Sequence, residues 1–443
     1  MTYEELKEQI AEAGIVGAGG AGFPTNFKLA KDMDYLVVNG AECEPLLYTD
    51  YGLLEEYGKE IIDTLSDVLN LCNIKEGIIG IKKKYGKLID MLNDYTQRYP
   101  HIKVKAVEKV YPVGDEVTLI YECTGRVIPR GELPSSQKVV EINVETLLNI
   151  SNKLRKNQSV THTYITLGGD IDTPKVLKVP IGTKVKDLLK LVGVEITENT
   201  SILIGGPMMG YFGTTETILT KTTKAILILP KDHLLHRLKQ GANINAVKRA
   251  MSSCSQCRMC TDLCPRNRLG HKVEPHKVMN AFANGLLNHY QGIETALGCC
   301  GCNLCSYFSC HHDLSPGELM MMIKKEMLAH GERGQKDLNP VPKDEKTPRV
   351  PSSRLLSRLG LSKYDKKAYL DETEICPELV YIPVSQHIGK KAELIVSKGV
   401  SVEAGDLVAS KSVEGLSANI HASISGKVID IRDNLIIIER IRR

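Results

Sequence analysis

The sequence contains no tryptophan, lacks any long apolar run and carries little net charge. No segment approaches the roughly 20 consecutive apolar residues that a helix needs to span a bilayer, and the charged N-terminal residues do not resemble a secretion signal. The formal charge of +4 is small for 443 residues, which argues against a nucleic-acid surface. We therefore expect a soluble, cytoplasmic protein of about three domains.

Cysteine is concentrated in one part of the chain, where nine of the 13 cysteines lie between positions 254 and 310. Such clustering favours metal ligation over the scattered framework of a disulfide-rich fold. The first four, at positions 254, 257, 260 and 264 with a proline following, have the spacing of a bacterial-type 4Fe-4S ferredoxin. A zinc ribbon instead needs two separated CxxC pairs, without a third cysteine that continues the spacing.

A second run of cysteines predicts a second cluster, and in two-cluster ferredoxins the fourth cysteine of each run binds the other cluster. The predicted ligands of cluster one are Cys254, Cys257, Cys260 and Cys310, and those of cluster two are Cys299, Cys302, Cys305 and Cys264. The second run departs from the pattern, because four residues instead of three separate its last two cysteines and His311 replaces the expected proline. Cys300 is left over. His311 and His312 are expected to be hydrogen-bond donors or surface residues rather than iron ligands.

Near the N-terminus, a helix expected over residues 2–13 with a capping box runs into a glycine-rich segment, residues 17–25. Its four glycines let the backbone approach a phosphate without Cβ atoms in the way. A short buried strand follows at residues 35–39, and residues 40–45 come at its C-terminal end, where ligands bind in α/β sheets. This arrangement predicts a nucleotide or flavin site.

These two segments resemble the FMN- and NADH-binding region of the complex I flavoprotein subunit, and still more the C subunit of the Rnf complex. The resemblance implies that FMN and NADH bind here, with Lys28 supplying a positive charge and Asn39, Glu42 and Glu44 contacting the flavin or nicotinamide. It places Gly17, Gly19, Gly20, Gly22 and Phe23 along the flavin phosphate and nucleotide path. Cys43 is interpreted as a packed thiol, Arg126 or Arg130 as a partner for a pyrophosphate, and no residue is assigned a catalytic role.

The same resemblance implies an α/β multidomain fold with permuted modules. Its domains are expected to be a Rossmann-like FMN/NADH-binding domain at 1–158, a β-grasp (SLBB) domain at 159–230, a helical ferredoxin insert with two 4Fe-4S clusters at 231–330, a linker at 331–377 and a barrel-sandwich hybrid (hammerhead) domain at 378–443. Helices are expected within 231–253 and 353–370, and the proline- and lysine-rich part of the linker is expected to lie over the surface.

In the Rnf protein the hammerhead domain comes first, whereas here it comes last. This permuted order resembles the cobalamin reductases of propanediol-degrading bacterial microcompartments. The resemblance implies an NADH-dependent flavin and iron-sulfur reductase of a corrinoid, with an adenosyltransferase or a shell protein as partner and a location inside a microcompartment. The alternative is a generic microcompartment or Rnf-type electron-transfer protein that feeds another acceptor, such as a glycyl-radical activating enzyme. The oligomeric state is left open.

Overall fold

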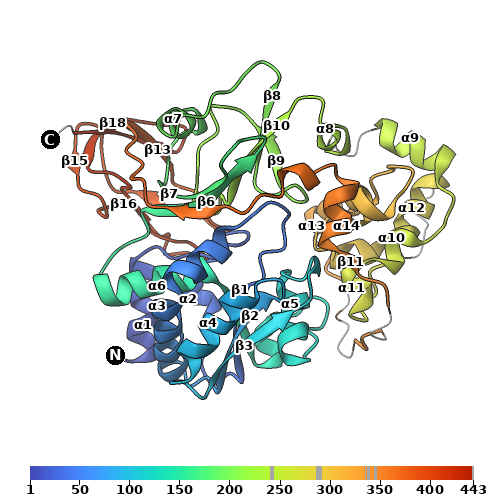
Figure 1. The fold of residues 1–443 in the computed structure, drawn as a ribbon, viewed down its shortest axis with the longest axis horizontal. Coiled ribbons are helices and arrows are strands. Elements are labelled where there is room, and N and C mark those ends of the chain that lie inside the picture. Colours follow the sequence, from blue (N-terminus) through green and yellow to red (C-terminus); the bar gives the residue numbers. More distant parts are fainter. Residues whose placement is uncertain (240–243, 286–291, 335, 337–339, 344–346, 442–443) are drawn as a thin grey trace.

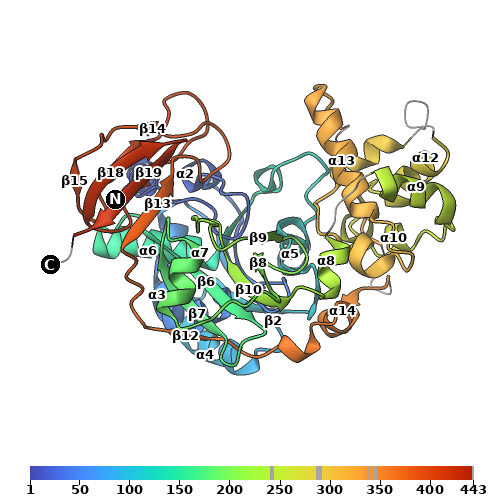
Figure 2. The same ribbon diagram turned by 90° about the horizontal axis from the view of Figure 1, so that it is seen from above.

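The computed structural model describes residues 1–239, 244–285, 292–334, 336, 340–343 and 347–441. Figure 1 shows an α/β unit at the bottom left, a second sheet and the C-terminal strands above it, and a helical unit on the right. The 90° view in Figure 2 separates the C-terminal strands from the helical unit, which lie at opposite ends of the molecule. Of the helices that the structure describes, none is long and apolar enough to cross a membrane.

The N-terminal sheet has four parallel strands in the order β3-β2-β1-β5. They are β1 (Tyr35–Gly40), β2 (Glu76–Lys82), β3 (Ile102–Val107) and β5 (Val139–Asn143). The helices around it are α1 (Tyr3–Glu12), α2 (Thr25–Lys28), α3 (Thr49–Leu71), α4 (Gly86–Thr96), α5 (Glu116–Thr124) and α6 (Val144–Lys156), and the 3-10 turn η1 spans Pro134–Gln137. The predicted capping box begins α1, since Thr2 and Glu5 exchange side-chain to backbone hydrogen bonds.

Buried strands of this sheet divide their side chains between two apolar cores. Leu36 and Val38 of β1 pack in the core with α3 and α6, whereas Val37 packs with α5 on the other face. Asn39 and Asn143 are the polar residues near the C-terminal ends of β1 and β5, which are neighbouring strands. The sheet therefore brings both amides to the edge where the glycine-rich segment lies.

The second sheet is mixed and has the strand order β12-β7-β6-β10-β8-β9, with β6 and β10 parallel at its centre. Its elements are β6 (His162–Gly169), β7 (Lys175–Pro180), α7 (Val185–Leu191), β8 (Thr200–Ile204), β9 (Tyr211–Gly213), β10 (Ala225–Pro230) and β12 (Tyr369–Asp371). The edge strand β12 comes from much later in the chain, so the sheet is completed only after the cysteine-rich part has been crossed.

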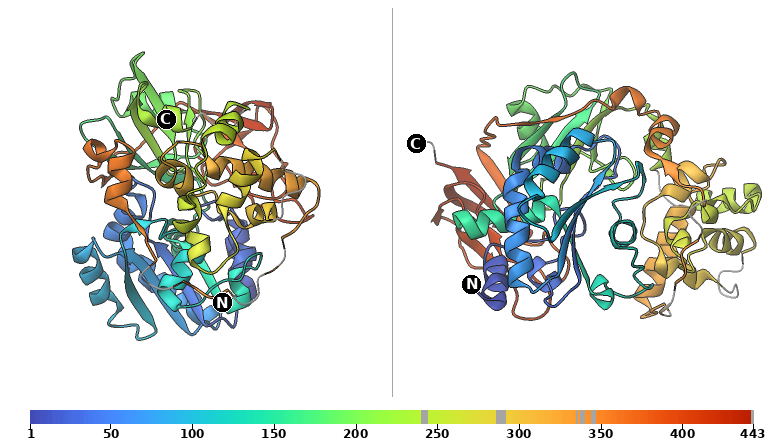
Figure 3. Two further views of the ribbon diagram at one scale, coloured as in Figure 1. Left: turned by 90° about the vertical axis from the view of Figure 1, so that its right-hand side faces the viewer. Right: turned by 60° about the horizontal axis from the view of Figure 1, so that its bottom comes forward.

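The helical unit carries the cysteine runs, and its elements are short. They are α8 (Leu234–Leu238), α9 (Ile244–Ser253), α10 (Met259–Asp262), α11 (Pro265–Arg268), α12 (Pro275–Ala283), η2 (Ile293–Gly298), the π-turn η3 (Cys305–Ser309) and α13 (Pro316–Ala329). The helix expected across 231–253 is thus found as α8 and α9, with residues 240–243 outside the described residues. Figure 3 shows this unit projecting from one side of the α/β unit.

The segment predicted as a linker is more ordered than expected. Residues 335, 337–339 and 344–346 of it lie outside the described residues, but the remainder forms β11 (Val350–Pro351) paired with β4 (Val110–Tyr111), then α14 (Ser352–Arg358), η4 (Ser362–Tyr364) and β12. Leu355, Leu359 and Leu361 are fully buried. This stretch therefore packs into an apolar core through a leucine of α14 and two leucines that directly follow the helix.

The C-terminal unit contains two small sheets, in the orders β13-β19-β18-β15 and β14-β16-β17. Their strands are β13 (Leu379–Pro383), β14 (Glu393–Leu394), β15 (Ser401–Val402), β16 (Leu407–Ser410), β17 (Ile420–His421), β18 (Gly426–Arg432) and β19 (Leu435–Arg440). Val380, Ile382, Ile436 and Ile438 lie in the shared core.

Lys221 joins three parts of the chain at one buried point. Its Nζ donates to the carbonyl oxygens of Gly14 at 2.7 Å and Asn419 at 2.8 Å, and its backbone amide donates to Gln386 Oε1 at 3.0 Å. The side chain is 3 % exposed, and burial lowers the pKa of its amine to about 7. A neutral amine supplies the two hydrogens that these carbonyls accept.

We expect the stability contributed by Lys221 to rise with pH above 7. An unfolded lysine stays protonated to about pH 10.4, so above pH 7 the unfolded state binds a proton that the folded state does not, and the unfolding free energy increases by up to about 1.4 kcal/mol per pH unit. Melting temperatures of the wild type and of Lys221→Met at pH 7 and 9 measure this linkage. An identical pH response in both proteins would contradict it.

Candidate functional site

The glycine-rich segment forms a loop between α1 and α2 at the C-terminal ends of β1 and β5. Its neck is closed by a hydrogen bond from Gly17 N to Phe23 O at 2.9 Å, and Ala18 N donates to Thr146 Oγ1 at 3.0 Å. A Cβ at Gly19 would lie 2.9 Å from Asn143 Nδ2, so this glycine allows the close approach of the loop to β5.

Gly20 and Gly22 show what the loop leaves open. A Cβ at Gly20 would meet no protein atom within 4 Å, and residues 19–21 are exposed. Gly22 has φ +74°, and a Cβ there would lie 2.9 Å from Gln386 O of the C-terminal unit. One side of the loop is therefore fixed by protein, while the other presents backbone with no side chain larger than the methyl group of Ala21. This fits a phosphate-bearing cofactor such as FMN.

Lys28 does not offer a free positive charge, contrary to the prediction. Its ammonium lies 2.8 Å from Glu116 Oε1 and 2.7 Å from Glu141 Oε2. Burial alone would lower the pKa of Lys28, but these two carboxylates raise it above its usual value. Asn39 Nδ2 donates to Glu141 Oε1 at 3.0 Å and to Gly114 O at 2.9 Å. Lys28 and Asn39 thus share one hydrogen-bonded group beside the loop.

The two glutamates after β1 have different partners. Glu44 is engaged by the second sheet, since its carboxylate oxygens accept from Met208 N at 2.9 Å and Met209 N at 2.8 Å. Glu42 accepts from Thr49 N at 3.2 Å, and burial, followed by the charge of Asp50, raises its pKa to about 8. Glu44 therefore holds the loop that contains the methionine pair, while burial favours the neutral form of Glu42.

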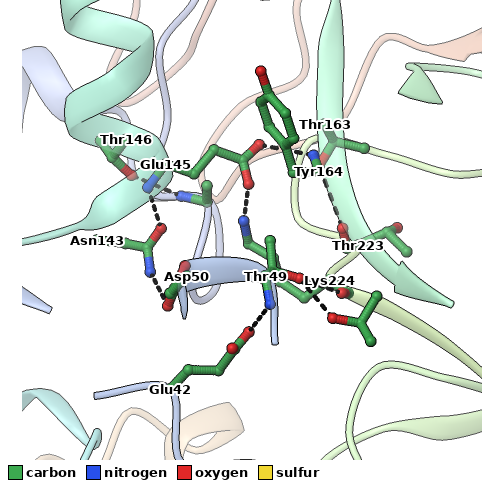
Figure 4. Close-up of polar contacts among 12 residues, drawn as sticks. Glu42, Thr49, Asp50, Asn143, Glu145, Thr146, Thr163, Tyr164, Thr223 and Lys224 are labelled. Atoms are coloured by element: carbon green, nitrogen blue, oxygen red, sulfur yellow. Dashed lines mark hydrogen bonds and ion pairs between the residues drawn. The ribbon is translucent and has the colours of Figure 1, made fainter. Parts of the chain in front are cut away.

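Figure 4 shows the polar contacts that connect this site to the second sheet. Asn143 Nδ2 donates to Asp50 Oδ2 at 2.9 Å, and Asn143 Oδ1 accepts from Glu145 N at 2.9 Å. Glu145 forms an ion pair with Lys224 and accepts from Tyr164 N at 3.2 Å. Burial is the main cause that raises the pKa of Asp50, to about 6. These contacts fix the C-terminal end of β5 relative to the second sheet.

Several residues that border the loop were not identified from the sequence, namely Glu141, Asn143 and Thr146. The one usable signal was an asparagine at the end of a buried strand, a position that β1 and β5 share. The sequence alone does not show that β1 and β5 are neighbours, because about 100 residues lie between the two strands. Cys43 agrees with the prediction of a packed thiol, since burial raises its pKa to about 12.

Arg126 and Arg130, the two arginines predicted to bind a pyrophosphate, both form contacts with other parts of the protein. Arg126 pairs with Asp34 at 2.7 Å and donates to Gln137 O at 2.6 Å. Asp34 precedes β1, so Arg126 lies at the opposite end of the strand from the glycine loop. Arg130 packs against Gly298 of the helical unit and donates to Lys272 O at 3.4 Å. Arg126 is thus turned away from the loop, whereas Arg130 contacts the helical unit and stays a predicted partner for a pyrophosphate.

The two cysteine loops repeat one backbone conformation. In the first, Gln256 and Arg258 flank Cys257 with φ of +58° and +64°. In the second, Gly301 and Asn303 flank Cys302 with φ of +70° and +57°. The repeat aligns Cys254, Cys257 and Cys260 with Cys299, Cys302 and Cys305, and it aligns Cys300 with Ser255. Cys300 thus falls outside the repeated set of three.

The first loop and the end of the second surround a common cavity. Cys254, Cys257, Cys260 and Cys310 all line it, together with His276 and His311. Burial raises the pKa of Cys260 to about 12, and the neighbouring thiols of Cys310, Cys257 and Cys254 raise it further. Four sulfur donors from distant positions therefore converge, as the crossed arrangement of ligands requires.

A π-turn accommodates the irregular spacing before Cys310. Cys310 N donates to Cys305 O at 3.0 Å, a hydrogen bond over five residues that defines η3. The wider turn takes up the one extra residue between these cysteines. Cys310 consequently still lines the cavity of Cys254, Cys257 and Cys260, despite the departure noted in the sequence.

The remaining four cysteines form a second group that is mostly buried. Cys264, Cys302 and Cys305 are each at most 9 % exposed. Burial raises the pKa of Cys305 well above its usual value, and the thiols of Cys299 and Cys264 contribute after it. Among the described residues, no three His, Cys, Asp or Glu side chains converge closely enough to hold a single metal ion.

The second cysteine group lies against the α/β unit. Tyr111 Oη donates to Cys302 O at 2.7 Å, and Arg266 pairs with Asp115 at 2.8 Å. Asp115 directly precedes Glu116, the partner of Lys28. Two polar contacts thus connect the flavin-type site to the second cysteine group. Cys257, the central cysteine of the first group, is exposed.

Comparisons with known proteins match three of the units described above, namely the α/β unit, the helical unit and the C-terminal unit. Residues 10–152 match the model of the Nuo51 FMN-binding domain, residues 253–315 that of a 4Fe-4S dicluster domain, and residues 359–440 that of the RnfC barrel sandwich hybrid domain. The chain is 36% identical to the cobalamin reductases PduS of Salmonella typhimurium and Citrobacter freundii, with 99% of this chain and 97% of each relative covered.

A second group of relatives covers less of the chain. The C subunit of the Na(+)-translocating ferredoxin:NAD(+) oxidoreductase complex of Acetobacterium woodii is 31% identical over 271 residues, which is 60% of this chain and 58% of the relative.

Proposed function

This chain belongs to the family of the cobalamin reductases PduS, which makes it an oxidoreductase, and we propose that it uses NADH to reduce a corrinoid. The observation that carries the proposal is the pair of contacts Tyr111–Cys302 and Asp115–Arg266, which seat a cysteine group directly on the flavin-type site. A flavin takes up a hydride as two electrons and releases them singly, which suits delivery to iron-sulfur groups.

The residues proposed to hold FMN are the loop glycines and their neighbours. Gly19, Gly20 and Gly22 are proposed to offer backbone amides, Gly17 closes the neck of the loop, and Phe23, Lys28 and Asn39 border it. Glu116 and Glu141 hold Lys28 in place, and Asn143 and Thr146 support the loop from β5 and α6. Glu42 is proposed to face the reacting ring as a protonated acid, and Glu44 to position the second sheet beside it.

Two 4Fe-4S clusters are proposed, held by the crossed sets described above. Cys310 is proposed to complete cluster one with Cys254, Cys257 and Cys260, and Cys264 to complete cluster two with Cys299, Cys302 and Cys305. Backbone amides support the sulfurs, since Gly301 N donates to Cys299 Sγ at 3.4 Å and Leu314 N donates to Cys310 Sγ at 3.5 Å. Such hydrogen bonds are among the features that set cluster potentials.

We also propose the domain boundaries 1–158, 159–230, 231–330 and 378–443. The strand order of the second sheet supports its interpretation as a β-grasp module, with α7 between its second and third strands. Residues 350–371, within the predicted linker, are proposed to be an ordered connection rather than a free linker.

The corrinoid assay tests the function. With reconstituted protein under anaerobic conditions, NADH is expected to bleach the flavin absorbance, and cob(III)alamin or cob(II)alamin is expected to restore it. Reduction of artificial dyes without reduction of any corrinoid would reject the proposed acceptor.

That outcome would favour the second candidate, an electron-transfer protein for another acceptor, which the similarity to a component of an ion-translocating complex supports. Co-purification with an adenosyltransferase or a microcompartment shell protein would support corrinoid reduction and a location inside a microcompartment.

A further inference from the structure

A second cavity lies away from the glycine loop, at the C-terminal ends of β1 and β2 and under α14. Residues 43–48 form one wall, and Lys82, Lys84, Lys109, Ser352 and Asp365 contribute to the others. Its volume of about 20 Å³ exceeds the roughly 10–15 Å³ that one water needs in the same measure. The cavity therefore admits one or two oxygen atoms of a ligand whose remainder lies outside it, and no residue of the glycine loop lines it.

Three lysines face this cavity without counter-ions. Lys82 is 5 % exposed, and in the described part of the chain neither it nor Lys84 or Lys109 forms an ion pair. The Lys84 ammonium lies over the rings of Tyr48 and Tyr85, 5.4 and 4.6 Å from their centroids. Burial, and after it the charges of Lys82 and Lys109, lowers the pKa of Lys84 to about 8. The lysines are thus close enough to repel one another.

A buried hydroxyl group points to a ligand independently of these charges. Ser352 is 8 % exposed, and its Oγ has no hydrogen-bond partner among the described residues. Its backbone amide donates to Lys109 O at 3.1 Å, which fixes the serine beside that lysine. An unsatisfied buried hydroxyl costs roughly 1–3 kcal/mol in general, so a bound acceptor would satisfy it.

The carboxylates on the wall leave the cavity positive. Asp365 accepts from Tyr48 Oη at 2.9 Å, and both oxygens of Glu44 are occupied by backbone amides of the second sheet. Three lysine side chains therefore face two carboxylates on the cavity wall, those of Asp365 and Glu44. Burial lowers the pKa of Lys82, so a bound anion would also stabilise its charged form.

We propose that this cavity binds a phosphoryl group, with Lys82, Lys84 and Lys109 neutralising its charge and Ser352 Oγ donating a hydrogen bond. Lysine is a common point-charge ligand of phosphate. The ligand is either free phosphate or the phosphate of a nucleotide whose remainder extends outward. The site contains no residue of the glycine loop, although Glu44 lies on its wall as well as beside the proposed flavin site, and it does not depend on the proposed acceptor.

The test is a titration of the full-length protein with inorganic phosphate at constant ionic strength. Calorimetry measures the binding affinity, and the melting temperature measures the stabilisation by phosphate. The wild type is expected to show saturable binding that Lys109→Gln and Ser352→Ala each weaken at least tenfold. Lys83→Gln is the matched control, because Lys83 is exposed at the same strand end and pairs with Glu108 at 2.6 Å. It should bind as the wild type does.

Comparison of phosphate, AMP and adenosine distinguishes the two sources. Tighter binding of AMP than of phosphate, with none of adenosine, identifies a nucleotide ligand, and equal binding of AMP and phosphate identifies free phosphate. The proposal is overturned if phosphate does not bind saturably, or if Lys109→Gln and Ser352→Ala bind it as well as the control does. Since Lys109 is only half-buried, these variants are expected to fold, and an unchanged melting temperature without phosphate verifies this.

Discussion

Replacing Cys302 by serine is expected to halve the iron content of the reconstituted protein, from about eight atoms, as two cubes require, to about four. Cys302 lies at the centre of the second cysteine loop, between the two left-handed residues, and its side chain is buried. A serine hydroxyl is a poor substitute for a thiolate ligand, and the enclosed site gives water little access to replace it. Iron analysis together with EPR of the reduced protein measures the loss.

Cys300→Ser is the matched control, because Cys300 is nearby, partly buried and also a cysteine, but falls outside the repeated loop conformation. It should retain both clusters. If Cys300→Ser loses iron and Cys302→Ser does not, the register of cluster two is wrong. Cys310→Ser should remove cluster one instead, and a full complement of iron in that variant would contradict the crossed arrangement.

Gly20→Val is expected to weaken FMN binding at least tenfold while leaving the melting temperature of the flavin-free protein unchanged. A Cβ at this position would meet no protein atom within 4 Å, so the added side chain disturbs only what binds above the loop. Fluorescence titration with FMN measures the affinity. This design differs from a change at Gly19, where a Cβ would clash with Asn143 and alter the protein itself.

Gly86→Val provides the control for the second prediction. Its Cβ would also meet no atom within 4 Å, but Gly86 begins α4, away from the loop. FMN affinity should stay at the wild-type value in this variant. Equal affinities of Gly20→Val and Gly86→Val would show that the flavin does not lie over the glycine loop.

The sequence predicted the grouping of the cysteines better than the surroundings of the glycine loop, and the reason is physical. Cluster ligands are encoded by short spacings, so Cys254, Cys257 and Cys260 could be grouped without knowledge of the fold. Even Cys310, with its irregular spacing, lines the same cavity as these three, because a π-turn absorbs one residue without moving its neighbours far.

The flavin-type site depends on long-range pairing, which a single sequence does not reveal. Lys28 was expected to present a charge, but Glu116 and Glu141 arrive from distant parts of the chain and neutralise it. Arg126 was assigned to a ligand because its partner Asp34 lies at the far end of β1. The ordered packing of residues 350–371 was not predicted, because its partners lie far away in the sequence. β11 pairs with β4, more than 200 residues earlier, and β12 pairs with β7 at the edge of the second sheet, almost 200 residues earlier.

The contact between the glycine loop and the C-terminal unit bears on how the protein matures. Ile388 N donates to Gly22 O at 3.3 Å, and Gln386 O approaches the same glycine. A nascent chain therefore lacks the contacts that support Gly22 until residues 386–388 have been synthesised. Chains shortened before position 386 are expected to bind FMN more weakly, although every loop residue is present.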